Sequence, residues 1–185
     1  MATGQGSVVR ASASWLAGCF SVGVIVTAAP ARGDGAHPGI GGHVGIATPL
    51  VTVTSDDTTT IGDQFTLLHP IGIGFQLTDK LAIDFETVLG NPIHPRGTTN
   101  LVIDPGVVYN TGAVVLGLRV AWKESAATNF GLIPLIHKGI FDLGGGANWF
   151  IEAAFPSFIN ATSDGAGNDK TTFEFNVVVH TGIGF

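Results

Sequence analysis

The side chains that could carry chemistry in this chain are few, and they do not gather into a catalytic or metal-binding motif. Two metal ligands on one strand or helix need a regular spacing, and no histidine has such a spacing to an acid or another histidine. The six are His37, His43, His69, His94, His137 and His180. No metal and no cofactor are therefore expected. We expect His180 to face the interior of the fold and to hydrogen bond there.

Nucleophilic catalysis by serine needs a base within hydrogen-bond reach of the hydroxyl. No histidine is placed beside a serine along any expected strand, and Ser157 and Ser163 are expected in a loop. The segment Asp164–Asp169 is similar to a calcium-binding turn, but its glycines and polar residues favour a flexible external loop. We therefore expect no enzyme; a lipid-modifying barrel enzyme is the alternative.

The composition excludes several classes of protein. Of 185 residues, 12% are charged and 45% hydrophobic, and 27 are glycine, whereas about 25% charged residues are usual. Disordered proteins, coiled coils and disulfide scaffolds do not fit these values. The net charge of −6 and the lack of a basic patch make nucleic acid an unexpected partner. A membrane protein fits best.

The first 31 residues have the features of a cleaved signal peptide. Arg10 precedes an uncharged stretch that ends in the small-residue site Ala29-Pro30-Ala31. An uncleaved membrane helix is one alternative, and lipid attachment at Cys19 is another. We expect a signal peptide over 1–31, a flexible segment over 32–40 and a single β-barrel domain over 41–185.

Most of the remaining chain alternates strictly between apolar and polar residues, which is the period of a strand with two different faces. The regular segments are residues 81–89, 101–109, 113–123, 140–155 and 172–185. Their apolar face carries no charge. Less regular strands are expected at about 41–54, 61–77 and 129–136, which makes about eight. An even number lets an up-and-down barrel close.

The expected connections alternate between short and long. Tight turns are expected at 78–80, 111–112 and 138–139, and polar loops at 55–60, 90–99, 124–128 and 160–170. Membrane barrels show short periplasmic turns and longer external loops. Four prolines fall inside the expected strands, and bulges would accommodate them. They are Pro49, Pro70, Pro105 and Pro134.

The two faces differ in a way that favours a membrane barrel over a soluble one. The polar face is rich in glycine, which suits a crowded narrow interior, and the apolar face carries large aromatic side chains. We therefore predict a closed, all-β, antiparallel up-and-down transmembrane barrel of about eight strands. Gly144-Gly145-Gly146 is expected to be a set of kinks within a strand.

The C-terminus resembles the final strand of bacterial outer-membrane β-barrels. It ends in Phe185, preceded at alternate positions by Ile183, Val179 and Val177, with Thr181 as a departure. The resemblance implies that the barrel-assembly machinery reads this strand as an assembly signal. It also implies outer-membrane lipid as a partner and the bacterial outer membrane as the location.

A cluster of charges is expected in the lumen. Its members are Asp84, Glu86, Asp104, Arg119, Lys123 and Glu174. Asp142 and Glu152 are expected to face inward as well.

Hairpin counting gives the expected pairing within this cluster. A two-residue loop at Thr111-Gly112 would place Asp104 opposite Arg119. The hairpin at 78–80 would place Gly74 opposite Asp84 and Gly72 opposite Glu86, which leaves room for an arginine side chain. Arg119 is then predicted to bridge Asp104 and Glu86. Separately hydrated charges are the alternative.

The expected function is that of a closed or narrow barrel acting as a structural or interaction platform. Its external loops would contact a partner that the sequence does not identify. One alternative is a small-solute pore, which the excess of lumenal acids would make cation-preferring. Another is a secreted, lipocalin-like carrier of an apolar ligand.

Overall fold

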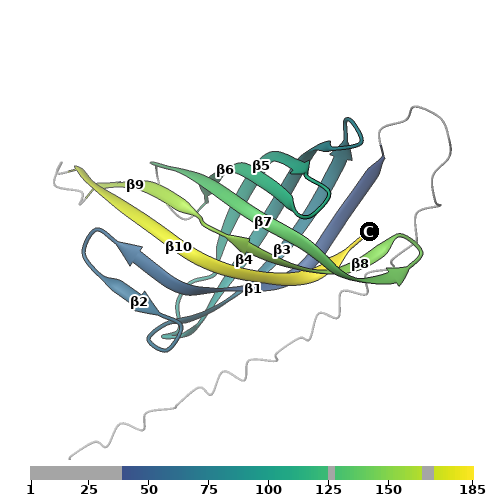
Figure 1. Ribbon diagram of the computed structural model, residues 1–185. Helices are drawn as coiled ribbons and strands as arrows, with labels where there is room; N and C mark the ends of the chain where they lie inside the picture. Colours follow the sequence, from purple (N-terminus) through teal and green to yellow (C-terminus); the bar gives the residue numbers. More distant parts are fainter. Residues whose placement is uncertain (1–38, 125–127, 164–168) are drawn as a thin grey trace, which may run out of the picture.

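The computed structural model describes residues 39–124, 128–163 and 169–185, so the predicted signal peptide lies outside the described residues. The described part consists of strands joined by turns and loops (Figure 1). The strands are β1 (Ile40–Thr54), β2 (Thr58–Thr60), β3 (Phe65–Gln76), β4 (Leu81–His94), β5 (Asn100–Asn110), β6 (Val115–Lys123), β7 (Thr128–Gly144), β8 (Ala147–Ala154), β9 (Ser157–Ser163) and β10 (Asp169–Gly184).

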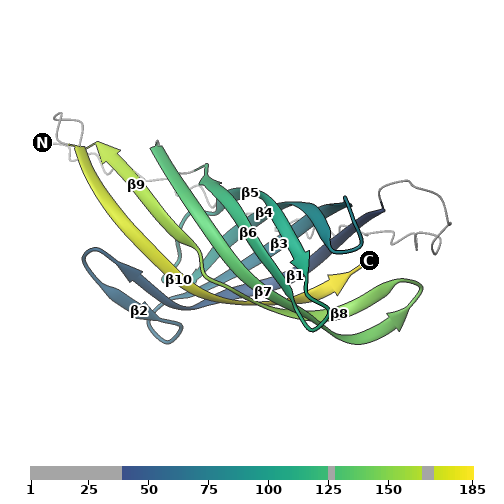
Figure 2. The same ribbon diagram turned by 45° about the horizontal axis from the view of Figure 1, so that its top comes forward.

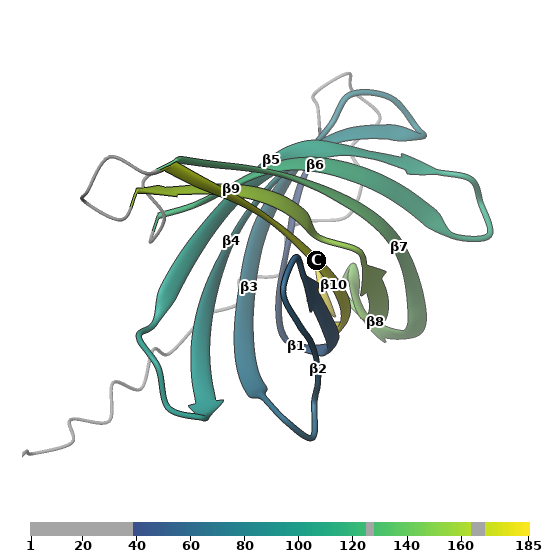
Figure 3. The ribbon, with the colours of Figure 1, turned by 90° about the vertical axis from the view of Figure 1, so that its left-hand side faces the viewer.

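These strands form one closed antiparallel barrel. Paired strands follow the order β1-β3-β4-β5-β6-β7-β8-β10, and β10 pairs with β1 to close the sheet. Strands β8 and β9 are one barrel strand interrupted at Phe155 and Pro156, because both pair with β7 and with β10 in one continuous register. Strand β2 pairs only with β1 among the described strands. The barrel therefore has eight strands, as predicted, and they surround a common axis when viewed from one end (Figure 3).

The inside and the outside of the barrel have opposite chemistry. Large apolar side chains such as Phe85, Leu118 and Trp149 are more than two-fifths exposed on the outer face. Acidic and basic side chains are buried inside. A water-soluble carrier would have the reverse arrangement, so the lipocalin-like alternative is wrong. Among the described residues, no helix is long and apolar enough to cross a membrane.

The two ends of the barrel differ, and we call them the turn end and the loop end. The turn end holds the β3–β4, β5–β6 and β7–β8 hairpins and the C-terminus; the loop end holds the other connections (Figures 1 and 2). Aromatic side chains lie on the outer face near both ends. The ring centres of Trp122 and Phe130 lie 6.2 Å apart in an edge-to-face contact near the loop end. The ring centres of Phe141 and Trp149 lie 5.4 Å apart in a stacked contact near the turn end.

The prediction was wrong about the β7–β8 hairpin. Strand β7 continues through the turn expected at 138–139, and the chain reverses at Gly144-Gly145-Gly146, where all three glycines have positive φ. The register of β7 shifts twice near this end, and each shift lets the strand continue after its alternation breaks. Two expected loops are also shorter, because β4 reaches His94 and β9 reaches Ser163. Ser157 and Ser163 therefore belong to a strand.

The β5–β6 hairpin also differs from the prediction. Asn110 pairs with Val115 rather than with Ala113, so the loop has four residues. Thr111 N–H donates to the Val114 carbonyl at 3.0 Å, and Asn110 Oδ1 accepts from Gly112 N–H at 2.8 Å. These bonds stabilise the longer loop and move the register by two residues. The β3–β4 register was predicted correctly, with Gly74 opposite Asp84 and Gly72 opposite Glu86.

The four strand prolines are accommodated in two ways. At Pro49 the register of β1 against β10 shifts before Val51, so the predicted bulge is present. The bulges predicted for Pro70, Pro105 and Pro134 are wrong. There the ladder to one neighbouring strand is interrupted and then resumes in the same register. Each interruption removes the need for the N–H that proline lacks.

Candidate functional site

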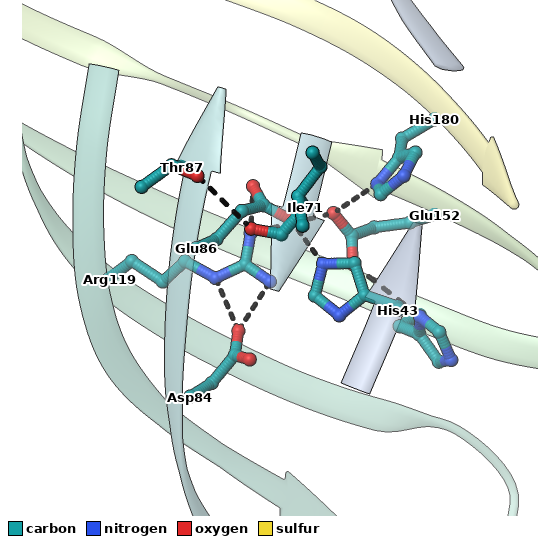
Figure 4. A network of polar contacts seen from close by, with 9 residues as sticks. His43, Ile71, Asp84, Glu86, Thr87, Arg119, Glu152 and His180 are labelled. Carbon is teal, nitrogen blue, oxygen red and sulfur yellow. Dashed lines mark hydrogen bonds and ion pairs between the residues drawn. The ribbon is translucent and has the colours of Figure 1, made fainter. Parts of the chain in front are cut away.

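A buried ion pair network crosses the barrel lumen, and Arg119 of β6 is its centre (Figure 4). Its Nε and Nη2 lie 2.7 and 2.5 Å from Asp84 Oδ2, and its Nη1 lies 2.8 Å from Glu86 Oε1. Glu152 of β8 is 3.8 Å from the same Nη1. All four residues are at most 5% exposed. The guanidinium therefore links β6, β4 and β8 across the interior.

Three histidines extend this network from the other strands. His43 Nε2 of β1 lies 2.5 Å from Glu86 Oε2. Glu152 contacts His180 Nδ1 of β10 at 3.3 Å and His137 Nδ1 of β7 at 3.5 Å. The expected lumenal hydrogen bond of His180 is confirmed. The network therefore receives side chains from β1, β4, β6, β7, β8 and β10.

A single aromatic ring packs among these histidines. Phe150 of β8 is fully buried, and its ring lies 4.4 Å from that of His137, 4.9 Å from His180 and 5.9 Å from His43. We call the ion pair network, the three histidines and Phe150 the lumenal plug. Its members are His43, Asp84, Glu86, Arg119, His137, Phe150, Glu152 and His180.

Two glycines make room for the plug. A Cβ on Gly106 would lie 2.6 Å from both Cα and Cγ of Arg119, and one on Gly72 would collide with the His43 ring. The sequence predicted that the lumenal glycines would leave space for an arginine. The structure shows that Gly106 gives that space to Arg119, and that Gly72 gives its space to His43.

The predicted pairing of Arg119 with Asp104 is wrong. Arg119 lies opposite Gly106, two residues further along β5 than expected. It therefore bridges Asp84 and Glu86 rather than Asp104 and Glu86. Asp104 of β5 lies opposite Glu86 of β4. Its side chain is 1% exposed, and its Oδ1 has no hydrogen-bond partner among the described residues. The error follows directly from the four-residue hairpin loop.

Lys123 and Glu174 form a separate pair nearer the loop end. Lys123 Nζ lies 2.5 Å from Glu174 Oε2, and the side chains are 17% and 24% exposed. The ammonium also lies 4.1 Å from the centre of the Phe158 ring. Both residues face the lumen as predicted, but they belong to its mouth and not to the plug. Asp142, which was expected to face inward, is exposed in the β7–β8 hairpin.

The site prediction omitted several members of the plug. His43, His137 and Phe150 were not included, and Glu152 was recognised only as an inward acid. His43 shares its face of β1 with Gly45 and Ala47, so alternation along β1 could have identified it. His137 lies just beyond the strand expected over 129–136, and that strand in fact continues to Gly144.

A cavity of about 390 Å³ lies on the loop-end side of the plug. Glu86, Arg119, Glu152 and His180 form its polar base. Its walls come from almost every strand and mix apolar with polar side chains. The apolar ones include Leu68, Val88, Val102, Ile133, Phe158 and Val178. Lys123 and Glu174 lie at its mouth. The lumenal cavity is therefore closed by the plug at its base.

A closed barrel is one of only two structures that can satisfy its backbone within lipid. This one has eight antiparallel strands, an apolar outer face and aromatic residues near both ends. Outer-membrane barrels have these features. The chain has the architecture of a small bacterial outer-membrane β-barrel. The predicted fold class is confirmed, and the location in the bacterial outer membrane stays a prediction.

No protein-family model matches the chain, and no curated protein matches it. A search of solved structures found the crystal structure of the outer membrane protein OprG from Pseudomonas aeruginosa. The identity is 12% and the TM-score 0.44, over 80% of this chain and 96% of that one. The strand pairing of this chain shows the closed barrel independently of that similarity.

The predicted assembly signal lies on the strand that closes the barrel. Ile183 and Phe185 are 41% and 42% exposed on the outer face, and Val177 and Val179 are half-buried. Thr181, the departure from the apolar row, accepts a hydrogen bond from Trp149 Nε1 at 2.8 Å. Recognition of these residues by the assembly machinery stays a prediction.

The lumenal histidines contact glutamates rather than serines. His43 contacts Glu86, and His137 and His180 contact Glu152. Within the described ranges, no group of three or more His, Cys, Asp or Glu side chains is arranged to hold a metal ion. The expectation that the chain is not an enzyme stays a prediction. Residues 164–168 of the segment that is similar to a calcium-binding turn lie outside the described residues.

Proposed function

We propose that the protein is a closed barrel of the outer membrane that serves as an interaction platform, with its loop end as the contact surface. The lumenal plug is the observation that carries this proposal. Arg119 and its carboxylate partners are at most 5% exposed, and Phe150 is fully buried beside them. An eight-stranded barrel is just wide enough for side chains to fill, and here they form a continuous network across it.

The connection between β1 and β3 supports a contact role for the loop end. The Thr60 N–H and hydroxyl both donate to Asp63 Oδ2, at 2.9 and 2.8 Å. Lys170 of β10 forms an ion pair with Asp56 at 2.7 Å. These bonds hold exposed polar side chains in a defined arrangement, which a partner can recognise with less ordering cost. The proposal names no partner.

The charge of the lumen favours one alternative, a cation-preferring pore. In the described part of the chain five acidic side chains face the lumen or its mouth, against the two permanent cations Arg119 and Lys123. The acids are Asp84, Glu86, Asp104, Glu152 and Glu174. A ring of acids selects cations in a pore, so this alternative requires only that the plug opens.

Planar-bilayer recording of the purified chain decides between the two. A closed platform gives no steady current, whereas a steady current that favours cations would replace the proposal with a pore. Folding is checked beforehand by the heat-dependent gel shift that detergent-solubilised membrane barrels show. Recovery of the protein in a soluble fraction without detergent would contradict both functions.

A further inference from the structure

One buried carboxylate in the lumen is left without a partner by the plug. Asp104 is 1% exposed, and its Oδ1 makes no hydrogen bond with any described residue. A buried acceptor without a donor costs free energy. Such a group in a native structure therefore needs an explanation.

Arg119 does not supply the missing donor. Its Nε and Nη2 are directed to Asp84, and its Nη1 lies between Glu86 and Glu152. The residue opposite Asp104 on β4 is Glu86, which is a second acid. Asp104 thus has an acid for its neighbour, and no cation among the described residues forms an ion pair with it.

Asp104 also lines the cavity above the plug. A volume of about 390 Å³ lies in the range of small-molecule sites, which are mostly apolar with a few placed polar groups. The same cavity is also lined by Val88, Val102 and Ile133. The cavity therefore combines partly apolar walls with two buried polar atoms that lack a hydrogen-bond partner among the described residues, Asp104 Oδ1 and His180 Nε2.

We propose that this cavity binds a small organic ammonium with a compact apolar body, whose N–H group donates to Asp104 Oδ1. The apolar part would lie against the valine and isoleucine walls, and the ammonium would satisfy the carboxylate. The excess of acids over cations in the lumen favours a positive ligand over a negative one. The mouth, formed by Lys123 and Glu174, lies at the loop end, so the ligand would enter from that side.

The test uses phenethylamine as the probe for the ammonium and its apolar body. Two compounds of similar shape are the matched ligands: 2-phenylethanol, which is neutral, and 3-phenylpropanoate, which is an anion. Binding to the full folded chain in zwitterionic detergent is measured by calorimetry, with empty micelles subtracted. We expect phenethylamine to bind at least about tenfold more tightly than either matched ligand, because hydrogen bonds between charged groups are the stronger ones.

Three variants locate the site. Asp104→Asn should weaken phenethylamine binding to the level of 2-phenylethanol, and Val102→Trp should abolish it by filling the cavity. Asp142→Asn is the control, because it removes an exposed aspartate of the β7–β8 hairpin and should leave binding unchanged. Each variant is first shown to fold by the gel shift, and Asp104→Ser replaces Asp104→Asn if the latter fails.

The proposal is overturned if the wild-type chain binds none of the three compounds or binds them equally. It is also overturned if phenethylamine binding survives Asp104→Asn or Val102→Trp. The inference goes beyond the proposed platform, and the two can fail separately. Conductance tests whether the barrel is closed, and calorimetry tests whether the lumenal cavity binds a ligand.

Discussion

Gly106 lies directly opposite Arg119 across strands β5 and β6, and the missing side chain at Gly106 is what gives Arg119 its path to Asp84. Asp84 pairs with Gly106 on the other side, so the three residues form one row across β4, β5 and β6. Arginine can therefore reach across the glycine to the acid on the second strand. The plug depends on this small residue as much as on the charges themselves.

Gly106→Ala is expected to destabilise the barrel by about 1–3 kcal/mol, the range for an overpacked interior. The new Cβ would lie 2.6 Å from Cα and Cγ of Arg119, so backbone must move. Gly74→Ala is the control on the same face, because the nearest atom to its Cβ is 3.8 Å away. Urea unfolding in lipid measures both. Equal effects of the two substitutions would contradict the role given to Gly106.

The coupling of Arg119 to Asp84 is tested by a double-mutant cycle. Arg119→Ala should cost about 3–5 kcal/mol, because it leaves buried carboxylates without a cation. Together with Asp84→Ala it should cost much less than the sum of the single effects, because the two residues are in contact. The same cycle with Asp104→Ala should give a clearly smaller coupling. A larger coupling to Asp104 would restore the pairing first predicted from the sequence.

The sequence predicted the faces of the strands correctly because lipid and lumen impose opposite requirements on alternate residues. Phe85 and Trp149 are exposed outward, and Glu86 and Phe150 are buried inward, as alternation requires. Alternation does not fix how far one strand slides along the next. That offset is set by the length of the hairpin loop. Because the β5–β6 loop has four residues instead of the expected two, Arg119 lies opposite Gly106 rather than opposite Asp104.

The β7–β8 hairpin shows a second feature that alternation in the sequence does not determine, namely where a strand ends. The register of β7 shifts between Gly139 and Phe141, so alternation before and after that point has different phases. A change of phase looks the same in sequence whether the chain turns or bulges. Alternation therefore predicts a turn at Lys138-Gly139 and kinks at 144–146. In the structure the register shifts at the first place and the chain turns at the second.

A substitution in this hairpin separates the two interpretations. Gly146 has a φ of +87°, and no atom lies within 4 Å of where its Cβ would be. Gly146→Ala should therefore cost about 1–2 kcal/mol through backbone conformation alone. Gly139→Ala should cost clearly less, because the nearest atom to its Cβ is 3.5 Å away and its φ is not positive. The reverse order in urea unfolding would place the turn at Gly139.

Phe150 and Arg119 close the lumen by different physical means, so their removal should have separable effects. Phe150→Ala deletes a fully buried ring that packs against three histidines, and it should cost about 3–5 kcal/mol. Phe173→Ala is the matched control. That ring is 48% exposed on the outer face and leaves no cavity inside the barrel when it is removed, so its loss should cost clearly less than the loss of Phe150.

The same pair of residues predicts how the barrel would open. Phe150→Ala alone should stay closed in bilayer recording, because Arg119 still links Glu86 on β4 to Glu152 on β8 across the lumen. The combined Phe150→Ala and Arg119→Ala chain should conduct and prefer cations, since buried acids then line the passage without their arginine. A steady current through the Phe150→Ala chain would show that the ion pairs do not close the barrel. A combined chain that folds and still carries no current would show that other side chains do.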